Sequence, residues 1–143
     1  PTSWVMVDSP TVGNVISSIK QWRVFVSQSP SGPFLGLKAY DGTRVFETGG
    51  VVEAKHGDVL KTVVEARGGD GAILRLVSSQ GVEEAIPVKG ESFRCVKEIN
   101  LRRGCLFIRA ELGWYADPFS VNPVEDDTVF ALTNPVYFKQ AGG

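Results

Sequence analysis

The sequence predicts a mainly β protein: an antiparallel β-sandwich preceded by one β–α–β segment. Short runs of β-branched and aromatic residues recur after residue 33. Turn pairs such as Asp41-Gly42 and Gly49-Gly50 separate them at a spacing of roughly 8–12 residues, which is typical of a sandwich. Residues 1–28 differ, because a helical pattern lies there between two apolar strands. We therefore expect two units, residues 1–28 and residues 29–143.

The first strand and the helix have separate signatures. Residues 4–7 (Trp-Val-Met-Val) are apolar on both strand faces, which is typical of a strand buried from both sides in a parallel sheet. Ser9 is the expected N-cap and Pro10 the expected first helical residue. The helix should end near Trp22, and residues 24–27 should form the next strand. One apolar stripe at helical spacing consists of Val12, Val15, Ile16 and Ile19.

A strand buried on both faces needs parallel neighbours, which the rest of this sequence does not predict. Residues 1–28 are therefore expected to be the end of an α/β barrel or sheet encoded upstream, and the alternative is a sandwich with an added N-terminal helix. In the first case an apolar surface is exposed, which favours a homodimer or an added strand from a partner. Its expected residues are Trp4, Met6, Val15, Ile19 and Trp22.

Eight strands are expected in the second unit. They cover residues 34–40, 44–47, 59–67, 72–79, 82–88, 91–99, 104–112 and 129–138. Residues 91–99 and 104–112 are predicted to pair as a hairpin. In that register Cys95 and Cys105 point to opposite faces, so two free thiols are expected, which favours a reducing, cytoplasmic compartment. The core face should contain Leu106, Ile108, Ala110 and Leu112, with Phe93 and Cys95 across the hairpin.

Charge and hydropathy exclude two kinds of partner. The formal net charge is −1, with 15 Lys and Arg scattered among 16 Asp and Glu, so no basic stripe is present and nucleic-acid binding is not expected. No apolar run approaches the roughly 20 residues of a membrane-spanning helix, so no membrane partner is expected. The acidic run at residues 125–127 is expected to be a solvated loop rather than a calcium site.

Few residues could carry chemistry. His56, the one histidine, could form a metal or acid–base cluster with Glu53 and Asp58, but His-Gly-Asp between two strands favours a turn. Trp114 and Tyr115, at a strand end, could form a platform for a sugar. In a separate feature, Arg109 and Glu111 share the outward face of their strand, where an ion pair with a neighbouring strand or contact with another domain is expected.

Four stretches carry a resemblance to a known family. They are residues 4–7, residues 23–27 (Arg-Val-Phe-Val-Ser), residues 107–111 (Phe-Ile-Arg-Ala-Glu) and residues 131–137 (Ala-Leu-Thr-Asn-Pro-Val-Tyr). In this order they resemble the C-terminal part of PHP-type (polymerase and histidinol phosphatase-like) metallohydrolases of the carbaryl-hydrolase-like branch. The sequence departs from that family at Trp22, where the family has glycine before the arginine.

The resemblance implies a hydrolase whose clustered His, Asp and Glu ligands bind two or three divalent metal ions in the upstream catalytic domain. This chain has one histidine, so none of those motifs can be transferred to it. The chain alone is therefore expected to have no catalytic activity, no metal and no cofactor. Its expected role is that of an accessory domain which packs against the upstream catalytic domain of the same protein. The alternative is an independent immunoglobulin-like binding module.

Overall fold

The computed structural model describes residues 1–122 and 125–140, which form twelve strands and one helix. The elements are β1 (Thr2–Val5), α1 (Val12–Lys20), β2 (Val24–Ser27), β3 (Phe34–Asp41), β4 (Arg44–Glu47), β5 (Val51–Ala54), β6 (Val59–Arg67), β7 (Ile73–Ser78), β8 (Gly81–Pro87), β9 (Ser92–Asn100), β10 (Phe107–Trp114), β11 (Thr128–Thr133) and β12 (Val136–Gln140). The mainly β character predicted from the sequence is confirmed.

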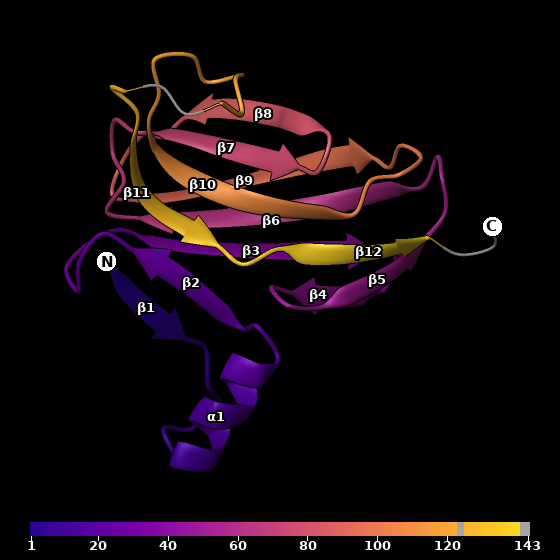
Figure 1. The fold of residues 1–143 in the computed structure, drawn as a ribbon, viewed down its shortest axis with the longest axis horizontal. Coiled ribbons are helices and arrows are strands. Elements are labelled where there is room, and N and C mark those ends of the chain that lie inside the picture. The colour runs from indigo at the N-terminus through magenta and orange to yellow at the C-terminus, as the bar shows by residue number, and fades with distance from the viewer. Residues whose placement is uncertain (123–124, 141–143) are drawn as a thin grey trace.

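The strands form two sheets that pack against each other as a sandwich (Figure 1). The smaller sheet has the order β4-β3-β6-β9 and is antiparallel. In the larger sheet, β10 pairs with β7 on one side and with β11 and β12 on the other. β8 extends the sheet beyond β7, and β2 followed by β1 extends it beyond β11. β5 pairs with β12 in parallel, whereas the other pairs are antiparallel.

Alternate side chains of both sheets fill one core. β3 contributes Leu35, Leu37 and Ala39, and β6 contributes Leu60, Val64 and Ala66. From the opposite sheet Ile108, Ala110 and Leu112 of β10 are fully buried, as the alternation predicts. Burial of each large aliphatic side chain stabilises the fold by about 1.5–3 kcal/mol. The prediction was wrong for Leu106, which precedes β10 and is 58% exposed.

The predicted hairpin between residues 91–99 and 104–112 is also wrong. β9 pairs with β6 in the smaller sheet, whereas β10 lies in the centre of the larger sheet. The connection buries Leu101 and Cys105, so it crosses the end of the core instead of forming a solvated turn. Phe93 and Cys95 still pack against the core, from the sheet opposite β10. Both cysteines are free thiols.

The N-terminal segment has the predicted order of strand, helix and strand but a different pairing. β1 and β2 are antiparallel, with Trp4 opposite Phe25, so they do not form the predicted parallel unit. β1 is an edge strand with Ser3 and Trp4 exposed, so it is not buried on both faces. α1 has nine residues and projects beyond the end of this strand pair instead of covering a sheet face (Figure 1). The assignment of residues 1–28 to an upstream domain stays a prediction.

The helix begins two residues later than the sequence predicts. Thr11 is the N-cap, and its hydroxyl accepts a hydrogen bond from the Asn14 backbone N–H at 3.2 Å. Ser9 instead accepts from the Asn14 side-chain amide at 2.8 Å. Pro10 therefore precedes the cap. Ser9 and Thr11 are both candidate caps. The helix starts after Thr11, because the Thr11 hydroxyl accepts from the third N–H of the helix.

Three segments fix the other end of α1, and we call this contact the clasp. Trp22 has a φ of 59°, a left-handed conformation that glycine adopts at lower cost. Its carbonyl accepts a hydrogen bond from the Asn134 side chain at 3.0 Å, and the Asn134 N–H donates to the Val24 carbonyl. Gly49 donates to the Pro135 carbonyl at 2.8 Å. The predicted single strand over residues 129–138 is wrong, since β11 ends before Asn134-Pro135 and β12 begins after this pair, where proline cannot donate to the ladder.

Gly49 permits the close approach within the clasp. A Cβ atom there would lie 1.9 Å from the Gln21 carbonyl oxygen, and the φ of Gly49 is +85°. We expect Gly49→Ala to lower the free energy of unfolding by at least about 3 kcal/mol, because strain and overlap add. Gly57→Ala is the matched control, since Gly57 has a φ of +92° with no atom within 4 Å, and should cost about 1–2 kcal/mol. Equal losses of unfolding free energy for Gly49→Ala and Gly57→Ala, measured by urea unfolding, would contradict the close approach at Gly49.

Candidate functional site

The helix α1 turns an apolar face to solvent. Val12, Ile16 and Ile19 follow each other at i, i+4 and i+7, and their exposed fractions are 77%, 48% and 50%. The buried residue of the helix is Ser18, on another side. A surface helix normally buries its apolar stripe against its own core, so this arrangement is inverted. Trp22, which follows the C-cap of the helix, is also exposed, with 60% of its surface accessible. We call Val12, Ile16, Ile19 and Trp22 the outer face of α1.

The other predicted surface residues lie beside it. Trp4 is 40% exposed, and its ring stacks on Phe25 with a centroid distance of 6.1 Å. Phe25 in turn meets the ring of Phe34 edge-on at 5.2 Å. Trp4, Met6 and Phe34 line an apolar groove of about 370 Å³. Of the five residues predicted for this surface, Trp4, Ile19 and Trp22 are exposed, whereas Met6 and Val15 are half-buried.

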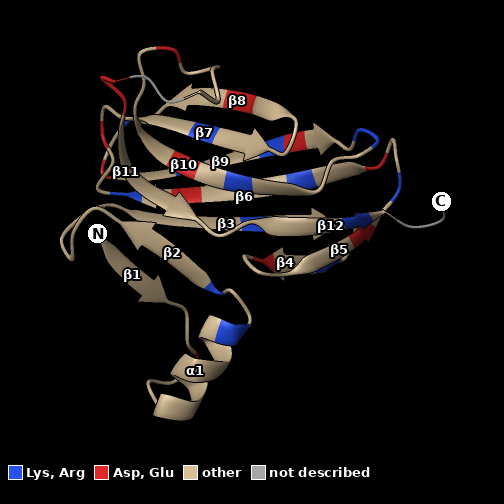
Figure 2. Ribbon diagram, viewed as in Figure 1, with Lys and Arg blue, Asp and Glu red and all other residues tan. Residues whose placement is uncertain are grey.

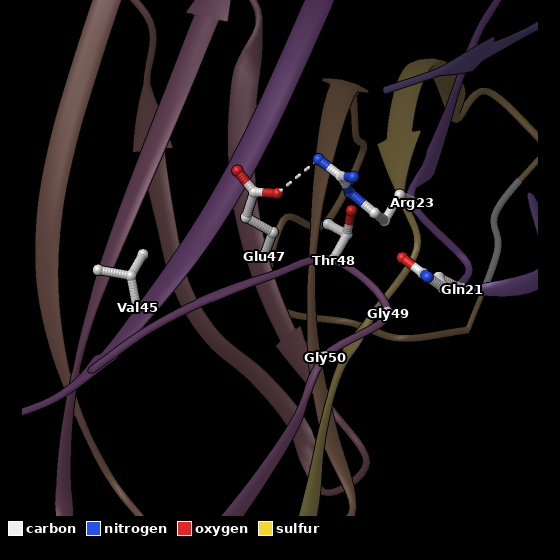
Figure 3. Close-up of a pocket in the computed structure, with 7 residues that line it drawn as sticks. All are labelled: Gln21, Arg23, Val45, Glu47, Thr48, Gly49 and Gly50. Atoms are coloured by element: carbon white, nitrogen blue, oxygen red, sulfur yellow. Dashed lines mark hydrogen bonds and ion pairs between the residues drawn. The ribbon is translucent and has the colours of Figure 1, made fainter. Parts of the chain in front are cut away.

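A polar notch of about 530 Å³ lies between the end of α1 and the β4–β5 turn (Figure 3). Across it, Nη2 of Arg23 donates to Oε2 of Glu47 at 3.1 Å. Their charges cancel, so the notch offers neither a cation nor an anion site. The hydroxyl of Thr48 is buried without a hydrogen-bond partner in the part of the chain that the structure describes. The sequence did not predict the notch, because the segments that line it, residues 21–23 and 45–50, are distant along the chain.

A buried ionic network occupies the outer side of the larger sheet. Arg75 on β7 donates to Oε2 of Glu111 at 2.6 and 3.1 Å, and Arg109 donates to Oε1 at 2.9 and 3.0 Å. Arg75 also donates to the Ser120 carbonyl at 2.7 Å, which attaches the loop after β10 to the sheet. The predicted ion pair between Glu111 and a neighbouring strand is confirmed. Its partner Arg75 was missed, because one arginine in an apolar strand gives no signal of burial.

The two rings of the predicted sugar platform do not act together. Trp114 is 52% exposed and packs edge-on against Phe130 at 6.1 Å. The guanidinium of Arg75 covers the ring of Tyr115 at 3.8 Å, so that face is occupied. Burial raises the pKa of the Tyr115 phenol well above its usual value; the charge of Glu111 adds to this shift and the charge of Arg75 opposes it. Trp114 is therefore the exposed ring of the pair.

The predicted polar candidates lie mostly at exposed positions in and beside turns. His56 is exposed in the turn between β5 and β6, as the turn interpretation predicts, and the Asp58 carboxylate accepts from the Lys55 N–H at 2.8 Å in the same turn. Glu53 is exposed on β5. In the acidic run, the Asp127 carboxylate accepts from the Ala116 N–H at 2.8 Å. Residues 1–122 and 125–140 contain no group of three or more His, Cys, Asp or Glu arranged to hold a metal ion.

No protein-family model, curated protein or solved structure matches this chain. Within the described residues, no helix has the length and apolar character needed to cross a membrane. The outer face of α1 is a feature that the packing of the described residues does not explain.

Removing Arg75 tests the ionic network. We expect Arg75→Met to lower the free energy of unfolding by about 3 kcal/mol, because it removes one partner of a buried ion pair. The pair is shielded from solvent, since the two side chains are 7% and 9% exposed. Arg109→Met is the matched control and should cost about 1 kcal/mol or less, because the Arg109 side chain is 33% exposed. Equal losses of unfolding free energy for Arg75→Met and Arg109→Met in urea would show that burial of the Arg75–Glu111 pair adds no stability.

The raised pKa of Tyr115 predicts a loss of stability in alkali. A tyrosine in the unfolded chain titrates near pH 10, whereas folded Tyr115 keeps its proton at higher pH. Below pH 10 the Tyr115 phenol is protonated in both the folded and the unfolded state. Above pH 10 the unfolded state alone releases this proton, which favours unfolding by up to about 1.4 kcal/mol per pH unit. In urea unfolding from pH 8 to 11, Tyr115→Phe should lose less stability than the wild type. Trp114→Phe, which removes no titrating group, should keep the wild-type slope.

Proposed function

We propose that this chain is a non-catalytic accessory domain of a PHP-type metal-dependent hydrolase, with an immunoglobulin-like sandwich that packs against the catalytic domain and stabilises it. The observation that supports it is the outer face of α1. Val12, Ile16, Ile19 and Trp22 are large apolar side chains that stay exposed among the described residues. Faces of this kind mark interaction sites. The catalytic domain encoded upstream is the partner in this proposal.

The energetics of α1 favour such a partner. An isolated helix of nine residues is marginal in water, and α1 buries only Ser18 against its own domain. Covering one large apolar side chain completely contributes about 1.5–3 kcal/mol. Docking of the outer face would therefore stabilise both the helix and the domain that receives it. The clasp holds the helix end against the sandwich, so the sandwich would act as a rigid support for the docked face.

The chemistry in this proposal belongs to the other domain. Its metal ligands would activate a water for phosphoester or related hydrolysis, and the parent protein would bind divalent metal ions. Residues of this chain would contribute no ligand and no proton transfer. The resemblance of residues 131–137 to the family supports this assignment, and the bonds of Asn134 give those residues a structural role in the clasp.

The test uses a longer polypeptide that includes the coding region upstream of residue 1. That region should contain His-x-His and Asp-x-His clusters. In the long protein, Ile16→Ser with Ile19→Ser should lower the melting temperature by roughly 5 °C or more, because two buried side chains lose their contacts. The same double change in the 143-residue chain should have little effect, since both residues are already exposed.

Leu106→Ser is the matched control for this experiment. Leu106 is 58% exposed and lies outside the outer face of α1, so its replacement should leave the melting temperature of the long protein unchanged. An upstream region without metal-ligand clusters would contradict the assignment to a hydrolase. An unchanged melting temperature for the double variant would contradict docking through α1.

The second candidate function is an independent immunoglobulin-like binding module that stacks a sugar on Trp114. The exposed ring of Trp114, held edge-on by Phe130, favours it. Titration with soluble oligosaccharides, followed by tryptophan fluorescence, distinguishes the two functions. A saturable response in the wild type that Trp114→Ala abolishes would support sugar binding. No response, or the same response in the variant, would exclude it.

A further inference from the structure

The strand β1 differs from the other strands at the edges of the two sheets. Natural edge strands carry charges or proline that prevent pairing with another chain. Four edge strands of the described chain have such residues: Arg44 and Glu47 in β4, Glu53 in β5, Glu83, Glu84 and Pro87 in β8, and Arg94, Lys97 and Glu98 in β9. The sequence of β1 is Thr-Ser-Trp-Val, with no charge and no proline (Figure 2). β1 therefore lacks both of these protections.

The ladder between β1 and β2 shows which backbone groups face this edge. The Met6 N–H donates to the Arg23 carbonyl at 3.0 Å, and Trp4 lies opposite Phe25 in the same register. Because hydrogen-bonded pairs alternate along an antiparallel ladder, the backbone N–H and C=O groups of Trp4 are directed toward β2. The N–H and C=O groups of Ser3 and Val5 are then directed away from β2. Ser3 thus presents unpaired backbone groups at an exposed position.

We propose that a second copy of this chain pairs antiparallel with β1, so that the two larger sheets join across a twofold axis at Trp4. Ser3 of each copy then lies opposite Val5 of the other, and each such pair exchanges two backbone hydrogen bonds. A shift of the register by two residues would place Val5 opposite Pro1 in one direction and Ser3 opposite Val7 in the other. Pro1 and Val7 both lie outside β1. The register centred on Trp4 therefore satisfies all the outward groups.

Side chains and charge favour the same pairing. Trp4 lies opposite Trp4 of the second copy at a non-hydrogen-bonded position, where cross-strand side chains approach most closely and aromatic pairs are favourable. Trp4 is 40% exposed in the single chain, so its ring has apolar surface left to bury. The net charge of −1 gives little repulsion between two copies. This surface is the backbone edge of β1, distinct from the outer face of α1, and the inference does not depend on the proposed function.

Ser3→Pro tests the proposal, because it removes an N–H that faces the free edge and leaves the groups of Trp4 and Met6 that face β2 unchanged. Ser3→Ala is the matched control, since it removes the hydroxyl and keeps the N–H. Sedimentation analysis of the 143-residue chain should show a concentration-dependent dimer for the wild type and for Ser3→Ala. Ser3→Pro should weaken the dimer at least tenfold. Ser3→Lys, which places a charge on the edge, should act in the same direction if the proline variant fails to fold.

Circular dichroism is the control that checks whether each variant is folded. A wild type that stays monomeric up to several hundred micromolar would overturn the proposal. So would a folded Ser3→Pro or Ser3→Lys variant that dimerises as tightly as the wild type. A dimer that Ile16→Ser disrupts, while Ser3→Pro and Ser3→Lys leave it intact, would place the interface on the outer face of α1 and would also overturn the proposal.

Discussion

The clasp between Trp22, Gly49 and Asn134 is the contact on which the arrangement of the N-terminal segment depends. It joins the end of the only helix in the described chain to the β4–β5 turn and to the strand break near the C-terminus. Gly49 allows the approach because it has no Cβ. The side chain of Asn134 donates to the carbonyl of Trp22, whose φ is left-handed, and the Asn134 N–H donates to the Val24 carbonyl at the start of β2. The apolar outer face of α1 is consequently held away from the core.

The sequence predicted what is local. Alternation along residues 107–112 identified the core face of β10. It did not predict pairing, which depends on distant segments. β9 and β10 looked like a hairpin because they are neighbours in sequence, but the buried side chains of Leu101 and Cys105 take the connection across the core. Residues 4–7 were predicted to form a buried strand because they are apolar, but the strand covers Thr2–Val5 and lies at an open edge of the sheet.

The candidate site shows the same limit. Trp4, Ile19 and Trp22 were predicted to be exposed because the helix stripe and the strand lacked a partner in the sequence, and they are exposed. Arg75 could not be predicted, since its burial depends on Glu111 in the adjacent strand, on the ring of Tyr115 and on the Ser120 carbonyl. The notch beside Arg23 and Glu47 is likewise formed by the clasp, so no single stretch of sequence contains it.

The sandwich buries its apolar side chains in one core, whereas the outer face of α1 stays exposed. We propose that another domain of the same protein covers the outer face of α1. The most direct measurement is a structure of the longer protein, from which the buried area of that face can be calculated. We expect Val12, Ile16, Ile19 and Trp22 to be buried against the upstream domain. Finding these four side chains as exposed as they are in this chain would contradict it.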